Sequence, residues 1–303
     1  MKWIDLHTHS TFSDGALSPA ALIDLALQRG LKALALTDHD TVAGIPTFLN
    51  YAADKQIRVL GGIEISAWHD QNSMHILGYG LDQTDMELNR TLAQLQKARH
   101  QRNLDILDRL NELGIAISYV DLEHRQNSQV GRPHIARALI RMGVVNDFQE
   151  AFYRYLRRGA AAYVNSGRIH ATDAIRLIRG AGGAPVLAHP AATDAGLINL
   201  PNLLPELRQA GLVGIETHYP AHSHKQNKQL LQLAAKHGLI ATGGTDFHEK
   251  LPSGVPLGGS CRSVRIPYTC YQELSKFLGI EHDDPGSGTP MNHPQDTETR
   301  KIS

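Results

Sequence analysis

Cysteine is scarce in this chain of 303 residues, which contains only Cys261 and Cys270. Two cysteines cannot build the disulfide framework of a small secreted domain, nor a zinc site made of thiolates. So few cysteines suit a reducing compartment, and we expect the protein to be cytoplasmic. Any metal site would have to be built from other side chains.

The chain also lacks long apolar runs and an excess of charge of either sign. No stretch approaches the length of a membrane span, and residues 1–7 contain no apolar signal core, so we expect no membrane association. Lysine plus arginine and aspartate plus glutamate both number 30, which gives a net charge of zero with histidine neutral. This balance argues against a protein held to nucleic acid by bulk charge. A hydrophobic content of 42 % is enough for the core of one large domain.

Histidine, by contrast, is abundant, with 17 residues. Many of these histidines and several acidic residues occur in short clusters, and most clusters follow a short apolar run. All are residue types that bind metal ions. The nine candidates are His7, His9, Asp14, His39, Glu64, His75, His189, Asp246 and His248.

The apolar runs alternate with helical patterns along much of the chain. Strands are predicted at residues 3–6, 33–36, 58–65, 74–79, 185–188, 213–217, 239–242 and 263–266. Helices are predicted from Ser18 and Pro19 to Gly30, from Thr41 onward, and at residues 172–179, 203–210 and 225–237. This alternation predicts an α/β fold with a parallel sheet and crossover helices. Because active sites of barrels form at the carboxyl ends of the strands, we expect one polynuclear metal site there.

Two segments depart from the alternation. Residues 83–156 read as polar and helical, with no strand signal, and we expect a helical insertion that acts as a lid. Residues 281–303 contain almost nothing apolar, so we expect a disordered tail. The remaining residues, 1–82 and 157–280, would form one discontinuous barrel domain.

Each candidate ligand has a simpler explanation when it is taken alone. Asp14 precedes a glycine, which is turn chemistry, and Asp38 or Asp40 could cap a helix. Glu64, however, lies inside an apolar strand, where a carboxylate needs a partner such as a metal ion. Six imidazoles and three carboxylates suit Mn²⁺, Fe²⁺ or Zn²⁺, and nine ligands can hold three ions if Glu64 bridges. Asp38 could also orient a ligand imidazole from behind.

Several motifs resemble those of the polymerase and histidinol phosphatase (PHP) family of trinuclear metallophosphoesterases. The resemblance spans residues 4–265 and rests on His-Thr-His-Ser at 7–10, Leu-Thr-Asp-His-Asp at 36–40, Gly-Ile-Glu-Ile at 62–65, Ala-His-Pro at 188–190 and Thr-Asp-Phe-His at 245–248. It implies an intact ligand set, a distorted (β/α)₇ barrel and three divalent ions, Mn²⁺ foremost. The helical segment with Gly-Arg-Pro-His at 131–134 is similar to the branch that contains 3′,5′-nucleoside bisphosphate phosphatases and 5′→3′ exoribonucleases.

The substrate side is predicted from basic residues near helix starts and strand ends. Arg132 and His134 would flank a helix N-terminus that begins at Pro133, where backbone N–H groups favour anions. Arg132 can also grip a phosphate bidentately. Arg158 could contact a second phosphate, and His218 or His222 could touch phosphate or donate a proton to the leaving oxygen. Each of these residues could equally be an ordinary surface or core group.

The favoured hypothesis is hydrolysis of a nucleotide phosphate ester by hydroxide held between the metal ions, with Arg132 neutralising charge and His222 as a candidate acid. The substrate would be a small nucleotide or a short single-stranded RNA, and no obligate protein partner is expected. One alternative is a phosphatase of the same family that acts on histidinol phosphate. Amidohydrolase chemistry is a second alternative, although no lysine lies at a strand end. A non-catalytic module that keeps the fold is a third alternative.

Overall fold

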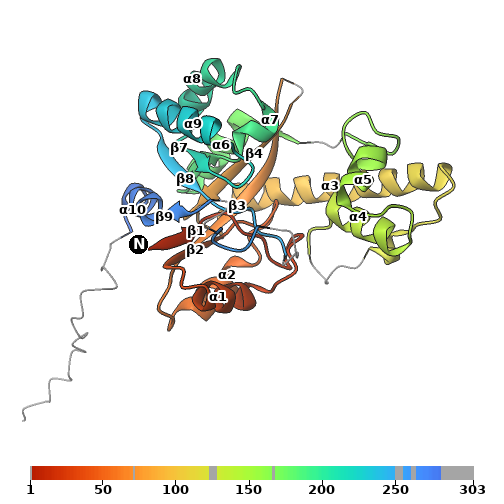
Figure 1. Cartoon of the computed structure of the whole chain (residues 1–303), viewed down its shortest axis with the longest axis horizontal. Coiled ribbons are helices and arrows are strands. Elements are labelled where there is room, and N and C mark those ends of the chain that lie inside the picture. Colours follow the sequence, from red (N-terminus) through yellow and green to blue (C-terminus); the bar gives the residue numbers. More distant parts are fainter. Residues whose placement is uncertain are drawn as a thin grey trace, which may run out of the picture.

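The computed structural model describes residues 2–70, 72–122, 128–165, 168–249, 255–260 and 264–280. The predicted disordered tail at residues 281–303 lies outside the described residues, as do Cys261 and Ser263, the first residue of the last predicted strand. The architecture of the described part is an α/β fold built around one sheet (Figure 1).

The sheet runs in the order β8-β7-β6-β4-β3-β2-β1-β9, and β5 pairs with β3 beside this path. The backbone N–H of Leu6, just after β1, donates to the carbonyl of Gly243 in β8 at 3.2 Å. An isolated bridge also joins Thr8 to Phe247. The sheet is therefore a nearly closed barrel. Its strands are β1 (Trp3–Asp5), β2 (Ala33–Leu36), β3 (Arg58–His69), β4 (Asn72–Tyr79), β5 (Ile169–His170), β6 (Ala184–Leu187), β7 (Gly214–His218), β8 (Ile240–Gly243) and β9 (Ile266–Pro267).

The strand directions correct the expectation of a wholly parallel sheet. Parallel pairs occur where a helix connects the strands, as in β1–β2, β2–β3, β6–β7 and β7–β8. The pairs β3–β4, β4–β6 and β1–β9 are antiparallel. Strands β3 and β4 follow each other directly as a hairpin, with Asp70 at a φ of 45°, and a tight connection of this kind forces opposite directions. The finer description as a (β/α)₇ barrel stays a prediction.

The helices cover the sheet and begin largely where the sequence places them. Helix α1 starts at Pro19, and the side chain of Ser18 accepts a hydrogen bond from the N–H of Ala21, as a capping serine should. Helix α2 begins only at Ile45, four residues after the predicted Thr41. The helices are α1 (Pro19–Gln28), α2 (Ile45–Ala52), α3 (Met86–Glu112), α4 (Arg132–Arg141), α5 (Phe148–Ala151), α6 (Ala171–Gly180), α7 (Pro190–Thr193), α8 (Leu200–Ala210), α9 (His224–His237) and α10 (Tyr268–Phe277), with short turns η1 (Tyr119–Asp121) and η2 (Phe152–Leu156).

A separate apolar core lies within the helical segment. Ile106 and Leu110 of α3 pack in one cluster with Ile135 and Leu139 of α4, apart from the clusters that fill the barrel. Figure 1 shows α3, α4 and α5 together at one side of the sheet. The described parts of the segment 83–156 are therefore helical as predicted, whereas the role of the segment as an inserted lid stays a prediction.

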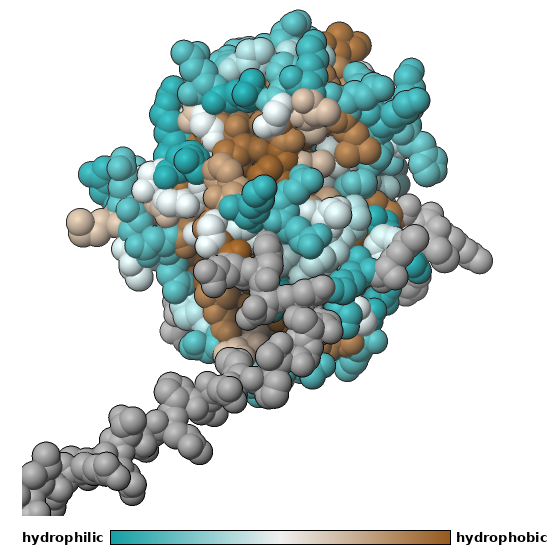
Figure 2. Space-filling model, turned by 90° about the vertical axis from the view of Figure 1, so that its left-hand side faces the viewer, coloured by the Kyte–Doolittle hydropathy of each residue, from teal (hydrophilic) through white to brown (hydrophobic). Residues whose placement is uncertain are grey.

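One face of the molecule illustrates how polar and apolar side chains are distributed at the surface (Figure 2). On the face drawn in Figure 2, hydrophilic side chains surround a smaller central band of apolar ones. None of the helices in the described part of the chain combines the length and the apolar character that a membrane crossing requires.

Two glycines at the end of β8 allow its close approach to the ends of β1 and β7. A Cβ at Gly244 would stand 2.2 Å from the Cβ of His7, which follows β1, and one at Gly243 would stand 2.5 Å from the Cβ of His218 in β7. No side chain larger than hydrogen fits between these backbones. Gly244 therefore allows the close approach that carries Asp246 to His7.

Candidate metal centre and active site

The nine predicted metal ligands come together at one end of the barrel. His7 and His9 follow β1, His39 follows β2, and Glu64 and His75 lie within β3 and β4. Every one of the nine is within ion-pair distance of another member of the set. The remaining four lie in the loops after β1, β6 and β8. These four are Asp14, His189, Asp246 and His248.

Glu64 lies at the centre of this cluster and is fully buried. A carboxylate placed among several buried imidazoles can act as a shared ligand, because its two oxygens can face different ions. Its Oε2 lies 3.0–3.3 Å from His7, His9 and His39, and its Oε1 lies 2.7 Å from His75 and 3.0 Å from His189.

Donor atoms of eight of the nine residues, all but His189, fall into three groups, in each of which they lie within 4.8 Å of one another. Asp246 Oδ1 lies 3.3 Å from His7 Nε2 and 3.0 Å from His9 Nε2. Two donors bound to one tetrahedral ion are about 3.3 Å apart, because each metal–ligand bond is roughly 2.0–2.2 Å long. The separations therefore suit shared ions. The groups are His7, His9, Glu64 and Asp246; His39, Glu64 and His75; and His9, Asp14, His39 and His248.

Many donor atoms of this cluster are buried without a hydrogen-bond partner among the described residues. They include Nε2 of His7 and His9, Nδ1 of His39, Oε2 of Glu64 and Oδ1 of Asp246. A buried polar atom left unpaired costs about 1–3 kcal/mol, so native proteins rarely gather several in one place. A site built for cations explains the gathering, and the donor set fits the divalent ions expected from the sequence.

Mutual charge shapes the pKa values in the cluster. Burial by itself would raise the pKa of Glu64, yet His75 and His39 outweigh it and hold the pKa well below its usual range. Burial opposes ionisation of Asp246 as well, and His7 and His248 reverse the effect. These carboxylates therefore stay ionised across the physiological range, which metal ligation requires.

Glu216 supports the cluster from behind, a role that sequence reasoning missed. Its Oε1 accepts a hydrogen bond from His7 Nδ1 at 3.1 Å, and its Oε2 accepts one from the backbone N–H of His189 at 2.8 Å. The bond to Nδ1 leaves Nε2 of His7 as the nitrogen that faces the other donors. A carboxylate inside the apolar start of β7 is the sequence signal that could have indicated this role.

Asp38 makes no hydrogen bond to an imidazole within the described part of the chain, which corrects the expectation that it orients one. Its Oδ1 accepts hydrogen bonds from the N–H of Ser10 at 2.7 Å and the hydroxyl of Ser13 at 2.6 Å, and its Oδ2 accepts one from the Ser10 hydroxyl at 2.7 Å. Asp38 therefore fixes the loop that carries Asp14. Among the described residues, Glu216 is the carboxylate that orients His7.

Two of the predicted ligands hold a strained backbone. His189 has a φ of 25° and Asp246 a φ of 54°, in the left-handed region of backbone conformation that residues other than glycine rarely adopt. Strain of this kind persists where the surrounding structure enforces it, and it gathers at functional sites.

Arg132 and His134 occupy the start of α4, with a small difference from the prediction. Arg132 is the first helical residue and Pro133 the second, and the N–H of Gly131 donates to His134 Nδ1 at 3.1 Å. The His134 ring thus serves the helix terminus through this nitrogen, and a contact with substrate stays a prediction. Arg132 donates to the carbonyl of Val164 at 3.2 Å, while its buried Nε has no partner in the described part of the chain.

His218 and His222 follow β7, where the sequence places them. His222 Nδ1 donates to the carbonyl of Thr217 at 2.9 Å, so a neutral ring carries its lone pair on Nε2. Burial lowers the pKa of His222, and burial together with His222 lowers that of His218. A neutral imidazole accepts a proton rather than donating one, so the geometry argues against His222 as the acid at neutral pH.

A large cavity beside the cluster, which we call the arginine pocket, has a volume of about 1220 Å³. On one side its wall adjoins the predicted ligands, since Ser73 lies two residues before His75 and Ala192 three residues after His189. Four arginines line it, and no carboxylate is among its lining residues. The lining is Trp68, Asn72, Ser73, Arg132, Phe152, Arg157, Arg158, Tyr163, Asn165, Arg168, Ala192 and Thr193.

The cations around this pocket repel one another. Burial, with Arg168 next, lowers the pKa of Arg132 to about 10. Burial, followed by Arg99 and Arg132, lowers the pKa of the neighbouring Arg102 to about 8. Arg99 has its own counter-charge in Asp40. Sequence reasoning identified Arg132 and Arg158, but it missed Arg102 and Arg168 because their proximity depends on how distant segments fold together.

Comparisons with known proteins show the family to which the chain belongs. A family model described as PHP domain matches residues 5–157. The chain is 35 % identical over 260 residues to a 3′,5′-nucleoside bisphosphate phosphatase of Chromobacterium violaceum, covering 85 % of this chain and 91 % of the relative. It is 34 % identical over 247 residues to a 5′-3′ exoribonuclease of Haemophilus influenzae, covering 82 % and 90 %.

A solved structure described as a metal-dependent phosphoesterase of Bifidobacterium adolescentis superposes with a TM-score of 0.82 at 28 % identity, covering 91 % of this chain and 96 % of the other. Fold, ligand cluster and relatives agree. The chain therefore belongs to the PHP domain family and is a metal-dependent hydrolase of phosphoester bonds.

Proposed function

We propose that this enzyme removes a phosphate from a nucleotide that carries a second phosphate, with a 3′,5′-nucleoside bisphosphate as the preferred substrate. The products would be a nucleoside 5′-monophosphate and inorganic phosphate. The observation that carries the proposal is the arginine pocket, which offers clustered cations next to the candidate metal centre.

The charge of the pocket supports a second phosphate. Arg132, Arg158 and Arg168 line one cavity without a carboxylate among the residues that line it with them. A phosphate held there would offset the repulsion between Arg132 and Arg168 and accept charge-assisted hydrogen bonds from planar guanidinium groups of the pocket. The phosphate to be hydrolysed would lie at the nine-residue cluster.

The aromatic residues of the pocket support a nucleotide rather than a simple sugar phosphate. Trp68 is 40 % exposed, and the guanidinium of Arg132 lies 5.0 Å from the centre of the Tyr163 ring. Aromatic faces and arginine planes are the surfaces on which nucleobases stack. The same arrangement suits the 5′-terminal nucleotide of a short RNA, so exonucleolytic hydrolysis is the second candidate.

The chemistry assigned to the chain's own residues is binding and orientation. We propose that the nine clustered residues hold three divalent ions, with Glu64 shared between two and Mn²⁺ as the preferred metal. When bound, such ions supply a lowered pKa for water and neutralise phosphoryl oxygens. Arg132 would hold the leaving side of the substrate, and His222 Nε2 would accept a hydrogen bond from it. Histidinol phosphate and amide substrates are the competing hypotheses.

The test compares adenosine 3′,5′-bisphosphate with a short 5′-phosphorylated RNA and with histidinol phosphate, each in the presence of Mn²⁺. Release of inorganic phosphate and AMP from the bisphosphate with the highest kcat/KM supports the proposal. Stepwise release of mononucleotides from the RNA, at a higher kcat/KM than the bisphosphate, would establish the exonuclease instead. Preference for histidinol phosphate would refute a nucleotide substrate.

The variant Arg168→Gln tests the pocket itself. Loss of a hydrogen bond to a charged group costs about 1.5–3 kcal/mol, so KM for the bisphosphate should rise roughly 10- to 100-fold. KM for adenosine 3′-monophosphate, which lacks the second phosphate, should change little. Arg90→Gln, at an exposed position of α3, is the matched control. Equal losses on both substrates would show that Arg168 does not recognise the second phosphate.

A further inference from the structure

A second group of possible metal ligands lies outside the nine-residue cluster. It consists of His69 at the end of β3, His170 at the end of β5 and Glu206 on α8, whose donor atoms all lie within 4.8 Å of one another. Strands β3 and β5 pair in parallel, with Trp68 opposite His170, which brings the two imidazole rings to 5.1 Å between centroids. From these residues we infer a separate zinc site, here called the outer site.

The distance between His69 and Glu206 resembles the distance between two ligands of one metal ion. His69 Nε2 lies 3.2 Å from each of the two oxygens of Glu206. A simple hydrogen bond would favour one oxygen at about 2.9 Å. Two ligands of one tetrahedral zinc ion are about 3.3 Å apart, because Zn–N and Zn–O bonds are roughly 2.0–2.2 Å long.

Nδ1 of each ring has a neighbour of its own. His69 Nδ1 lies 3.3 Å from Oδ2 of Asp70. His170 Nδ1 lies 2.8 Å from the hydroxyl of Thr172 and accepts a hydrogen bond from the backbone N–H of Thr172 at 3.4 Å. Zinc bound to Nε2 of His170 would require the ring hydrogen on Nδ1, where the Thr172 hydroxyl can accept it.

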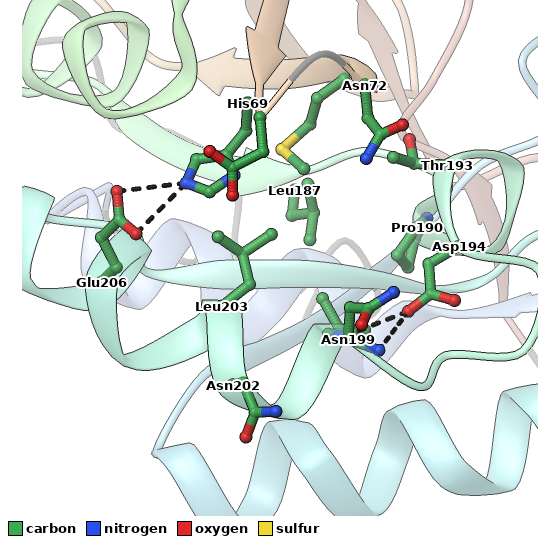
Figure 3. Close-up of a pocket in the computed structure, with 13 residues that line it drawn as sticks. His69, Asn72, Leu187, Pro190, Thr193, Asp194, Asn199, Asn202, Leu203 and Glu206 are labelled. Atoms are coloured by element: carbon green, nitrogen blue, oxygen red, sulfur yellow. Dashed lines mark hydrogen bonds and ion pairs between the residues drawn. The ribbon is translucent and has the colours of Figure 1, made fainter.

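The surroundings leave room for an ion to enter and to keep one open coordination position. His69 and Glu206 form one end of a cavity of about 350 Å³, where Figure 3 shows their side chains directed toward each other. The side chain of Glu206 is 51 % exposed, so zinc can reach it from solvent. Two histidines and one glutamate with a free fourth position are a ligand set typical of Zn²⁺.

A zinc ion in the outer site would join three segments that are distant in the sequence. It would tie the tip of the β3–β4 hairpin to the start of α6 and to α8. The same hairpin supplies Trp68 and Asn72 to the arginine pocket, so the ion would stiffen one wall of that pocket. The outer site shares no residue with the nine-residue cluster and does not depend on the proposed substrate.

The experiment measures zinc per chain after equilibrium dialysis of the full protein against buffered free Zn²⁺. The variants Glu206→Gln and His69→Gln should each bind one equivalent less than the wild type. His224→Gln, which changes an exposed histidine at the start of α9, should bind the same amount as the wild type. Because Glu206 is exposed on a helix, its replacement by glutamine is expected to leave the fold intact, which circular dichroism checks.

A second readout follows the hairpin directly. Added Zn²⁺ should slow amide hydrogen exchange at residues 68–70 in the wild type and in His224→Gln, and should have no such effect in Glu206→Gln. Unchanged zinc content in Glu206→Gln and His69→Gln would overturn the inference. The contact would then be an ordinary hydrogen bond between His69 and Glu206.

Discussion

Replacing Glu216 by glutamine should weaken metal binding without removing any of the nine predicted ligands. Glu216 is fully buried and accepts one hydrogen bond from His7 Nδ1 and one from the N–H of His189. Glutamine keeps the size of the side chain but offers one oxygen and one NH₂ group. Whichever way it is turned, the NH₂ group faces a hydrogen-bond donor, so one of the two contacts is lost.

The magnitude follows from the role of groups that orient metal ligands. Loss of such a partner costs about 10- to 100-fold in metal affinity, or roughly 1.4–2.8 kcal/mol. The assay is competition between the protein and a chelator for Mn²⁺, which gives the dissociation constant directly. At saturating Mn²⁺ the kcat should recover much of its wild-type value, because all nine candidate ligands remain in place.

The matched control is Glu87→Gln, which removes an exposed carboxylate in the first turn of α3. Its Mn²⁺ affinity should equal that of the wild type. An unchanged affinity in Glu216→Gln would refute the reasoning, because it would mean that His7 needs no orienting carboxylate. A loss of folding, visible by circular dichroism, would instead assign Glu216 to the stability of the barrel.

Two further outcomes follow from the packing. Gly244→Ala places a Cβ about 2.2 Å from the Cβ of His7, so β8 must move away from β1 and the affinity for Mn²⁺ should fall by more than 10-fold. In the control Gly180→Ala the new Cβ meets no atom within 4 Å, so this variant should bind Mn²⁺ like the wild type. Equal affinities in the two variants would contradict this prediction. Burial, with Glu273 second, raises the pKa of Cys270 to about 12. At pH 8 roughly one Cys270 in 10,000 is then a thiolate, so native Cys261→Ser protein should react with a thiol reagent only on unfolding, and rapid labelling of the native protein would count against the buried position.

The metal cluster was readable from the sequence because its geometry is local to strand ends. A strand is identified by a short apolar run, and β2 begins and ends where the run predicts. Parallel strands carry the residues that follow them to one end of the barrel, so His39 and His189 both reach Glu64 although 150 positions separate them in the sequence. The prediction was possible because this property of parallel strands follows from the backbone alone and requires no knowledge of individual side-chain contacts.

The direction of a strand and the pairing of very short strands could not be predicted from the sequence in this way. The apolar runs of β3 and β4 look alike whichever way β4 runs, and the hairpin between them contains no glycine or proline signal. Strand β5, with only Ile169 and His170, is too short to show a period. Its pairing depends on β3 already being in place, which is a tertiary effect. The proposed outer site could not be predicted for the same reason, because only the pairing of β3 with β5 brings His69 and His170 together.

The nine-residue cluster and the arginine pocket also differ in what each can determine about the reaction. The nine-residue cluster supplies general phosphoester chemistry, and the phosphatase and the exoribonuclease relatives resemble this chain about equally, at 35 % and 34 % identity. Substrate choice must therefore depend on residues outside the cluster. In the proposed function, the arginine pocket would supply such residues, which include Arg132 of α4, Arg158, Arg168 and Trp68 of the β3–β4 hairpin. Its shape depends on how the helical segment packs against the barrel, so changes in that packing should alter the substrate while leaving the metal chemistry in place.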